Sequence, residues 1–144
     1  MSEGFTESVV EHAAQGWLQS LGYGLRFGPE LAPDAPGSER ESFDEVVLPG
    51  RLRSALVRLD PVVATDALDE AFRKVVRMDA ADAVSRNRAF HRMLVDGITV
   101  EQTRPDGSVG GVIVRLIDFD NPDNNDWLGV NQFTVTSGGV NGHN

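Results

Sequence analysis

Two glutamates near the start of the chain carry the first chemistry that the sequence suggests. Glu7 and Glu11 stand four residues apart in a segment with helical periodicity, so both carboxylates fall on one helix face. Glu11 also adjoins the apolar stripe through its neighbours Val10 and Ala14. Paired carboxylates can hold a divalent cation, but they are also common on solvated helix faces. These residues alone favour the solvated face.

A second group of acidic residues lies late in the chain, at Asp118, Asp120, Asp123 and Asp126. Their spacing invites comparison with a calcium-binding loop. The EF-hand pattern fails, because Pro122 stands where a third ligand belongs, no glycine follows it and no glutamate lies downstream. Aspartate and asparagine in such loops commonly bond their own backbone. We therefore expect this loop to be a set of capped turns.

Other catalytic patterns are missing from the sequence. The chain has no cysteine, which excludes thiolate zinc sites and cysteine nucleophiles. It contains no G-x-S-x-G, Walker, Rossmann or HExxH motif. The PD…(D/E)xK pattern of metal-dependent nucleases is absent as well, since the single lysine, Lys74, has Phe72 two positions before it. The dipeptide Pro105-Asp106 is better explained as part of a hairpin turn.

The composition is that of a globular domain with an uneven charge distribution. The chain has 144 residues, 40% of them hydrophobic, and a net charge of −9. No apolar run is long enough to span a bilayer and no signal sequence is present, so we expect no membrane association and a cytoplasmic location. Residues 51–92 nevertheless hold nine basic and six acidic side chains. A basic middle could contact DNA phosphates, although a solvated helix face explains it more simply. The candidate DNA contacts are Arg51, Arg53, Arg58, Arg73, Lys74 and Arg77.

Helical periodicity covers the first half of the chain. Thr6 suits a helix N-cap, an apolar stripe follows it, and Gly22 is placed to end the helix. A loop rich in glycine and proline comes next, with a short strand expected at residues 23–27. Three further helices are predicted at residues 51–59, after a cap at Thr65, and at residues 84–95. They form a helical insert between about residues 50 and 96.

Strand patterns follow the helices. Residues 98–103 and 109–119 flank the turn signal Arg104-Pro105-Asp106-Gly107, which predicts a β-hairpin. Residues 127–135 are apolar on both faces, which is typical of a central strand covered on two sides. The sequence therefore predicts a single α+β domain with a three-stranded portion of sheet.

Four long stretches of the sequence resemble, in order, the N-terminal region of the type I restriction endonuclease R subunit. They read FTESVVEHAAQGWLQSLGY, RESFDEVVLPGRLRSALVRLDP, NRAFHRMLVDGITVE and VRLIDFDNPDNNDWLGVNQFTV. The resemblance spans Phe5 to Val135. It implies an enzyme-derived chain: one module from the nuclease and translocase subunit of a restriction–modification complex.

The resemblance also implies a site. In that family the region begins a PD-(D/E)xK nuclease core, and its first helix supplies a glutamate to a Mg²⁺ site. Glu11 is the first candidate for that catalytic and metal-binding role, and Glu7 is the second. The implied partners are DNA and the methyltransferase and specificity subunits. The ATP-driven motor of the family has no counterpart in this sequence.

The sequence departs from the family after Val135, where it ends in TSGGVNGHN without the catalytic aspartate and the (D/E)xK pair. We expect a truncated core that is catalytically incomplete alone. A docking module for the other subunits, or a DNA-contact module, is the alternative. If strand 127–135 has an open edge, the chain should self-associate there, because unpaired strand edges are templates for pairing.

Overall fold

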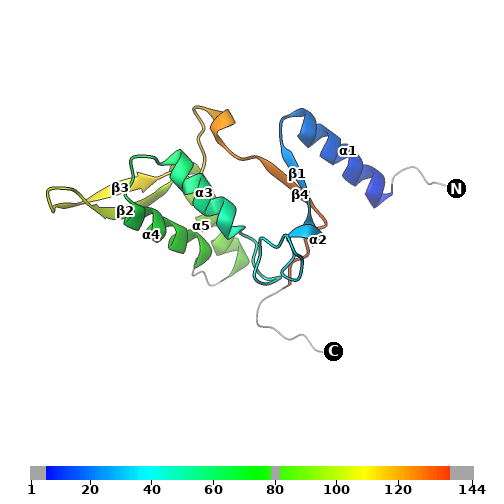
Figure 1. Cartoon of the computed structure of the whole chain (residues 1–144), viewed down its shortest axis with the longest axis horizontal. Helices are drawn as coiled ribbons and strands as arrows, with labels where there is room; N and C mark the ends of the chain where they lie inside the picture. The colour runs from blue at the N-terminus through cyan, green and yellow to red at the C-terminus, as the bar shows by residue number, and fades with distance from the viewer. Residues whose placement is uncertain (1–5, 79–81, 137–144) are drawn as a thin grey trace. The chain divides into compact units, whose positions relative to one another are not determined.

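The structure, a computed structural model, describes residues 6–78 and 82–136. Helices and strands are mixed in these ranges, which confirms the α+β prediction (Figure 1). The chain divides into two compact units, one drawn from Met1–Leu48 and Asp126–Asn144, the other comprising Pro49–Asn125. None of the helices in the described ranges has the length and apolar character needed to cross a membrane.

Helix α1, Glu7–Ser20, begins the first unit where the sequence predicts it. The hydroxyl of Thr6 accepts a hydrogen bond from the backbone N–H of Val9 at 3.4 Å and caps the helix. Gly22 follows the helix with φ 95°, a left-handed conformation that suits glycine. The apolar stripe of α1 is largely uncovered, since Trp17 is 70% exposed and Leu21 is 74% exposed.

Strand β1, Gly24–Phe27, pairs in parallel with β4, Leu128–Asn131 (Figure 1). The predicted strand at residues 127–135 is therefore shorter than expected, and its partner is β1. It has one neighbour among the described strands, so the second neighbour that a central strand needs is not among them. The strand ends at Asn131, because the next residue, Gln132, has a φ of 55° that is incompatible with extended pairing. The short helix α2, Gly28–Leu31, follows β1.

A buried arginine organises the rest of the first unit. Arg40 is only 3% exposed. Its guanidinium donates to the backbone carbonyls of Glu45 at 2.9 Å, Thr134 at 2.8 Å and Phe43 at 2.8 Å. The same group lies 4.0 Å from the ring centroid of Phe133. Arg40 thus fastens the loop before residue 48 to the segment that follows β4.

The second unit opens with the three predicted helices: α3 is Pro49–Leu59, α4 is Thr65–Val76 and α5 is Ala83–Asp96. Helix α4 packs on β2 through a stripe of Ala67, Ala71 and Val75, all buried. The predicted cap at Thr65 is wrong. Thr65 is the first helical residue, and Ala64 occupies the cap position without a side-chain hydrogen bond.

The β-hairpin is formed by β2, Ile98–Thr103, and β3, Val109–Val114, paired antiparallel from Ile98↔Val114 to Thr103↔Val109. Gly107 has φ 86° and donates its N–H to the carbonyl of Arg104 at 2.9 Å, so the predicted turn is confirmed. Strand β3 stops at Val114, short of the predicted residue 119. Because β2–β3 and β1–β4 are separate sheets, the three-stranded sheet does not form.

Candidate functional site

Glu11 lies half-buried on α1 and meets a residue from the far end of the chain. The side-chain Nε2 of Gln132 donates to its carboxylate, 3.1 Å from Oε1 and 3.2 Å from Oε2. Glu7, one turn earlier, is exposed and makes no side-chain hydrogen bond with any residue in the described ranges. Of the two predicted glutamates, only Glu11 is therefore joined to the end of β4.

Gln132 was not singled out by the sequence, and its backbone explains why. It is the one non-glycine residue with positive φ in the described part of the chain. Asparagine and aspartate, rather than glutamine, are the side chains that usually signal this conformation. Gly28 also lies against this turn, and a Cβ at Gly28 would overlap the carbonyl oxygen of Gln132. Neither the positive φ of Gln132 nor its contact with Gly28 leaves a local pattern in the sequence.

The donor set around Glu11 fits one corner of a magnesium site. Mg²⁺ prefers oxygen ligands, retains several waters and often uses only one or two carboxylates. The Glu11 carboxylate offers such oxygens on a partly exposed surface. Among the residues described, no group of three or more His, Cys, Asp or Glu side chains converges. These residues therefore provide a single ligand and not a complete cage.

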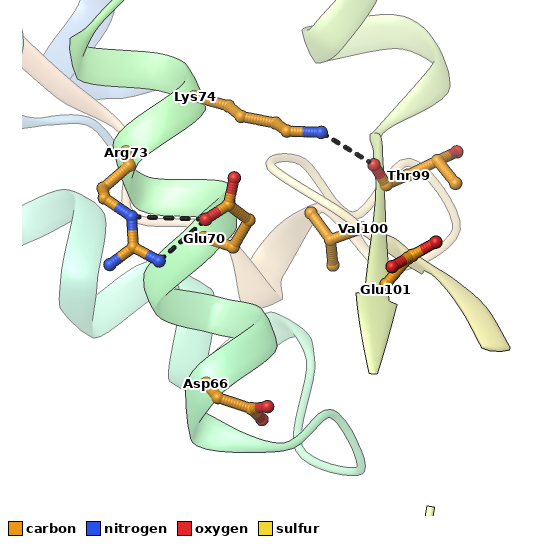
Figure 2. A pocket seen from close by; sticks show the side chains of 7 residues that line it. All are labelled: Asp66, Glu70, Arg73, Lys74, Thr99, Val100 and Glu101. Carbon is orange, nitrogen blue, oxygen red and sulfur yellow. Dashed lines mark hydrogen bonds and ion pairs between the residues drawn. The ribbon is translucent and has the colours of Figure 1, made fainter. Parts of the chain in front are cut away.

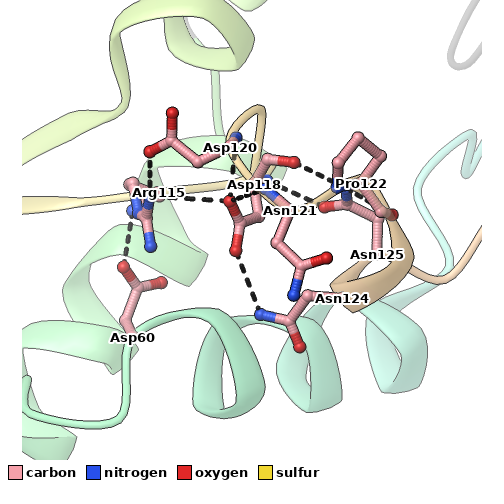
Figure 3. A network of polar contacts seen from close by, with 8 residues as sticks. All are labelled: Asp60, Arg115, Asp118, Asp120, Asn121, Pro122, Asn124 and Asn125. Atoms are coloured by element: carbon pink, nitrogen blue, oxygen red, sulfur yellow. Dashed lines mark hydrogen bonds and ion pairs between the residues drawn. The ribbon is translucent and has the colours of Figure 1, made fainter.

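The acidic loop is bonded to itself, as predicted (Figure 3). Asp118 Oδ1 accepts the backbone N–H groups of Asp120 at 3.1 Å and Asn121 at 2.9 Å. Its Oδ2 accepts from the side chain of Asn124 at 3.2 Å. These hydrogen bonds, led by that of Asn121, hold the pKa of Asp118 below its usual value. Its oxygens are thus occupied in capping a turn.

Asp60 is a buried carboxylate that the sequence reasoning missed. It is 5% exposed, and its Oδ1 accepts the backbone N–H of Arg115 at 2.7 Å (Figure 3). Its Oδ2 is buried without a partner in the described structure. Burial raises the pKa of Asp60, and the hydrogen bond and charge of Arg115 oppose that rise. The group connects the end of α3 to the segment after β3.

Most of the candidate DNA contacts on α3 and α4 have partners within the second unit. Arg53 lies 3.4 Å from a carboxylate oxygen of Asp69 and stacks on Phe72 at 3.7 Å. Arg58 donates to the backbone carbonyl of Asn124 at 2.7 Å. Arg51 is half-buried on α3. The guanidinium groups of Arg53 and Arg58 are thus engaged in contacts within the protein.

Arg73 and Lys74 border a hollow of about 620 Å³ between α4 and β2 (Figure 2). Arg73 pairs with Glu70 at 2.7 Å and lowers the pKa of that carboxyl, while Lys74 donates to the carbonyl of Thr99 at 3.2 Å. The lining carries charges of both signs and comprises Asp66, Glu70, Arg73, Lys74, Thr99, Val100 and Glu101. A hollow with three acidic side chains is a poor match for a phosphate backbone.

Helix α5 carries three exposed arginines. Arg86, Arg88 and Arg92 are exposed and have no side-chain partner among the described residues. Arg88 and Arg92 stand four residues apart and therefore share a helix face. Arg77, just after α4, is also exposed without a side-chain partner in the described ranges. The sequence counted the α5 arginines in its basic middle but did not select them as contacts.

Comparison with known proteins confirms the resemblance seen in the sequence. Residues 4–144 match the family described as the type I restriction enzyme R protein N terminus. The chain belongs to this family. No solved structure matches it.

Two endonuclease subunits of type I restriction enzymes are similar to this chain. The type I restriction enzyme MjaIXP endonuclease subunit of Methanocaldococcus jannaschii is 34% identical over 127 residues, which are 88% of this chain. The type I restriction enzyme HindI endonuclease subunit of Haemophilus influenzae is 34% identical over 131 residues, or 91% of this chain. The match spans 12% of the length of each relative.

Proposed function

We propose that this R-subunit N-terminal region helps to build a Mg²⁺-dependent nuclease site of the PD-(D/E)xK type, to which α1 contributes Glu11. The observation that carries the proposal is the pairing of Glu11 with Gln132, which joins the helix to the end of β4. Glu7 lacks such a connection, so it is the weaker candidate. A bound Mg²⁺ would polarise a DNA phosphate and activate water.

The chain alone is proposed to be catalytically incomplete. It has no (D/E)xK pair, since its one lysine follows Phe72 by two positions. Helix α1 therefore supplies a metal ligand, and the remaining catalytic groups and the ATP-driven motor come from outside this sequence. Within the complex we expect the methyltransferase and specificity subunits as partners, in the cytoplasm, with DNA as the substrate. Purified by itself, the chain should leave DNA intact in Mg²⁺ and ATP.

A chimera tests the role of Glu11. Residues 4–135 would replace the matching segment of the Haemophilus influenzae endonuclease subunit, and the assembled enzyme would be assayed for DNA cleavage. Glu11→Gln should abolish cleavage and leave ATP hydrolysis intact, because it removes a metal ligand without changing the side-chain shape. Glu7→Gln is the matched control on the same helix and should cleave normally. Normal cleavage by the Glu11→Gln chimera would refute the proposal.

A second candidate function is DNA contact through α5. The observation that favours it is the exposed pair Arg88 and Arg92, whose charges have no partner in the described structure. Two cations about one helical turn apart can neutralise phosphates along a strand. By contrast, Arg53 and Arg73 already pair with carboxylates.

The salt dependence of binding to a DNA duplex tests whether the arginines of α5 or those of α3 and α4 contact phosphates. The double variant Arg88→Ala, Arg92→Ala should bind more weakly and lower the slope of log K against log[salt] by roughly two units, about 0.9 for each lost phosphate contact. The matched control Arg53→Ala, Arg73→Ala should change the slope little. An unchanged slope in the α5 variant, or a larger change in the control, would assign the contact to α3 and α4.

A further inference from the structure

The hydrogen bond between Gln132 and Glu11 does little for stability by itself. Glu11 is half-exposed and Gln132 is exposed, so water can replace either partner. Hydrogen bonds between solvated side chains contribute little net free energy, because folding merely exchanges them for bonds to water. A purely structural purpose would not require glutamine at this position.

The backbone of Gln132 is nevertheless held in an unfavourable conformation. Its φ of 55° lies in the left-handed region, which a residue with a long side chain adopts rarely. Such a conformation persists only where the surrounding structure enforces it, and it is concentrated at functional sites.

Contacts on both sides of Gln132 enforce this turn. Gly28 lies against its carbonyl, and only a residue without Cβ fits there. On the other side, the buried Arg40 donates to the carbonyl of Thr134 and stacks on Phe133. The chain therefore fixes the segments before and after the turn, and the turn directs the glutamine side chain at Glu11.

The geometry leaves the carboxylate free to act as a ligand. A carboxylate has about four lone-pair positions, and the amide of Gln132 occupies only the side of Glu11 that it faces. Carboxylates that bind metals are commonly oriented by a neutral hydrogen-bond donor of this kind.

We propose that Gln132 is a positioning residue for Glu11: its amide fixes the direction in which the carboxylate presents its oxygens to a divalent cation. This inference rests on the proposed metal-binding role of Glu11. Arg40 and Gly28 support it indirectly, by holding the left-handed turn.

The test uses Mn²⁺ as the probe and the ¹⁵N-labelled chain. Substoichiometric Mn²⁺ should broaden the backbone amide signals around Glu11 and Gln132 selectively, and the Mn²⁺ dependence gives an apparent affinity. The decisive variant is Gln132→Gly, because glycine accepts positive φ and removes only the side-chain amide. Its urea midpoint should be equal to or higher than that of the parent chain, while its Mn²⁺ affinity should fall roughly tenfold. Asp34→Asn, which removes an exposed carboxylate elsewhere in the first unit, is the control and should change neither.

The outcomes separate the two proposals. If Glu11→Gln removes the broadening and Gln132→Gly does not weaken it, Glu11 binds the metal without help, and the positioning role is overturned. If Glu11→Gln leaves the broadening unchanged, the metal-binding role of Glu11 is itself overturned. A fall in both stability and affinity in Gln132→Gly would make the glutamine a structural residue and would also overturn the inference.

Discussion

Substitution of Arg40 tests whether one buried side chain holds the first unit together. Its guanidinium donates to three backbone carbonyls, those of Glu45, Thr134 and Phe43, over distances of 2.8–2.9 Å. It also stacks on Phe133 at 4.0 Å. A lysine at this position has a single ammonium on a flexible stem and cannot reproduce the planar fork.

The expected loss follows from these contacts. A hydrogen bond to a charged group contributes about 1.5–3 kcal/mol, but the three are not additive because the carbonyls regain water when the loop opens. We therefore expect Arg40→Ala to lower the free energy of unfolding by about 3–5 kcal/mol and Arg40→Lys by about 2 kcal/mol. The alanine variant should then unfold on heating about 10 °C or more below the parent chain.

Urea unfolding followed by tryptophan fluorescence is a suitable assay. Both tryptophans, Trp17 and Trp127, lie in the first unit and report on it directly. Hydrogen exchange adds a local measurement at Thr136, whose amide donates to the carbonyl of Phe43 at 3.0 Å and should exchange faster in both variants. Arg26→Ala is the matched control, since its ion pair with Glu30 is exposed and 3.9 Å long. An Arg40→Lys midpoint equal to that of the parent chain would refute the reasoning.

Three further predictions concern packing, pH and association. Gly28→Ala should destabilise the first unit by about 1–3 kcal/mol in urea unfolding, whereas Gly16→Ala, in open space on α1, should stabilise it by about 1 kcal/mol; equal midpoints would contradict this. Because burial raises the pKa of Asp60, the folded state holds that proton more readily than the unfolded state. The contribution of Asp60 to the free energy of unfolding is therefore greatest at low pH and declines as the pH rises from about 4. Asp60→Asn should flatten this decline in urea midpoints, and an unchanged slope would exclude Asp60 as its source. Finally, Gly24 N–H donates to the carbonyl of Trp127, so in the parallel ladder the N–H of Val130 faces the open edge of β4. Val130→Pro should weaken self-association in sedimentation experiments, and a parent chain that stays monomeric when concentrated would rule out pairing at this edge.

Elements whose signals are local can be predicted from the sequence alone. Thr6, Gly22 and the apolar stripe between them place α1, because capping and periodicity act within a few residues. The turn before Gly107 fixes the hairpin for the same reason. Four long stretches also sufficed to identify the family, since they match in order along most of the chain.

Contacts between distant groups, by contrast, depend on the three-dimensional fold. Strand β4 pairs with β1, about a hundred residues earlier, and no local pattern specifies that partner. Gln132 reaches Glu11 across 121 residues, through a left-handed turn held by Arg40 and Gly28. The sequence gives the charges of the arginines but not which of them are neutralised within the fold. Those contacts depend on side chains brought together by packing, so the candidate site could be located on α1 from the sequence but completed only in three dimensions.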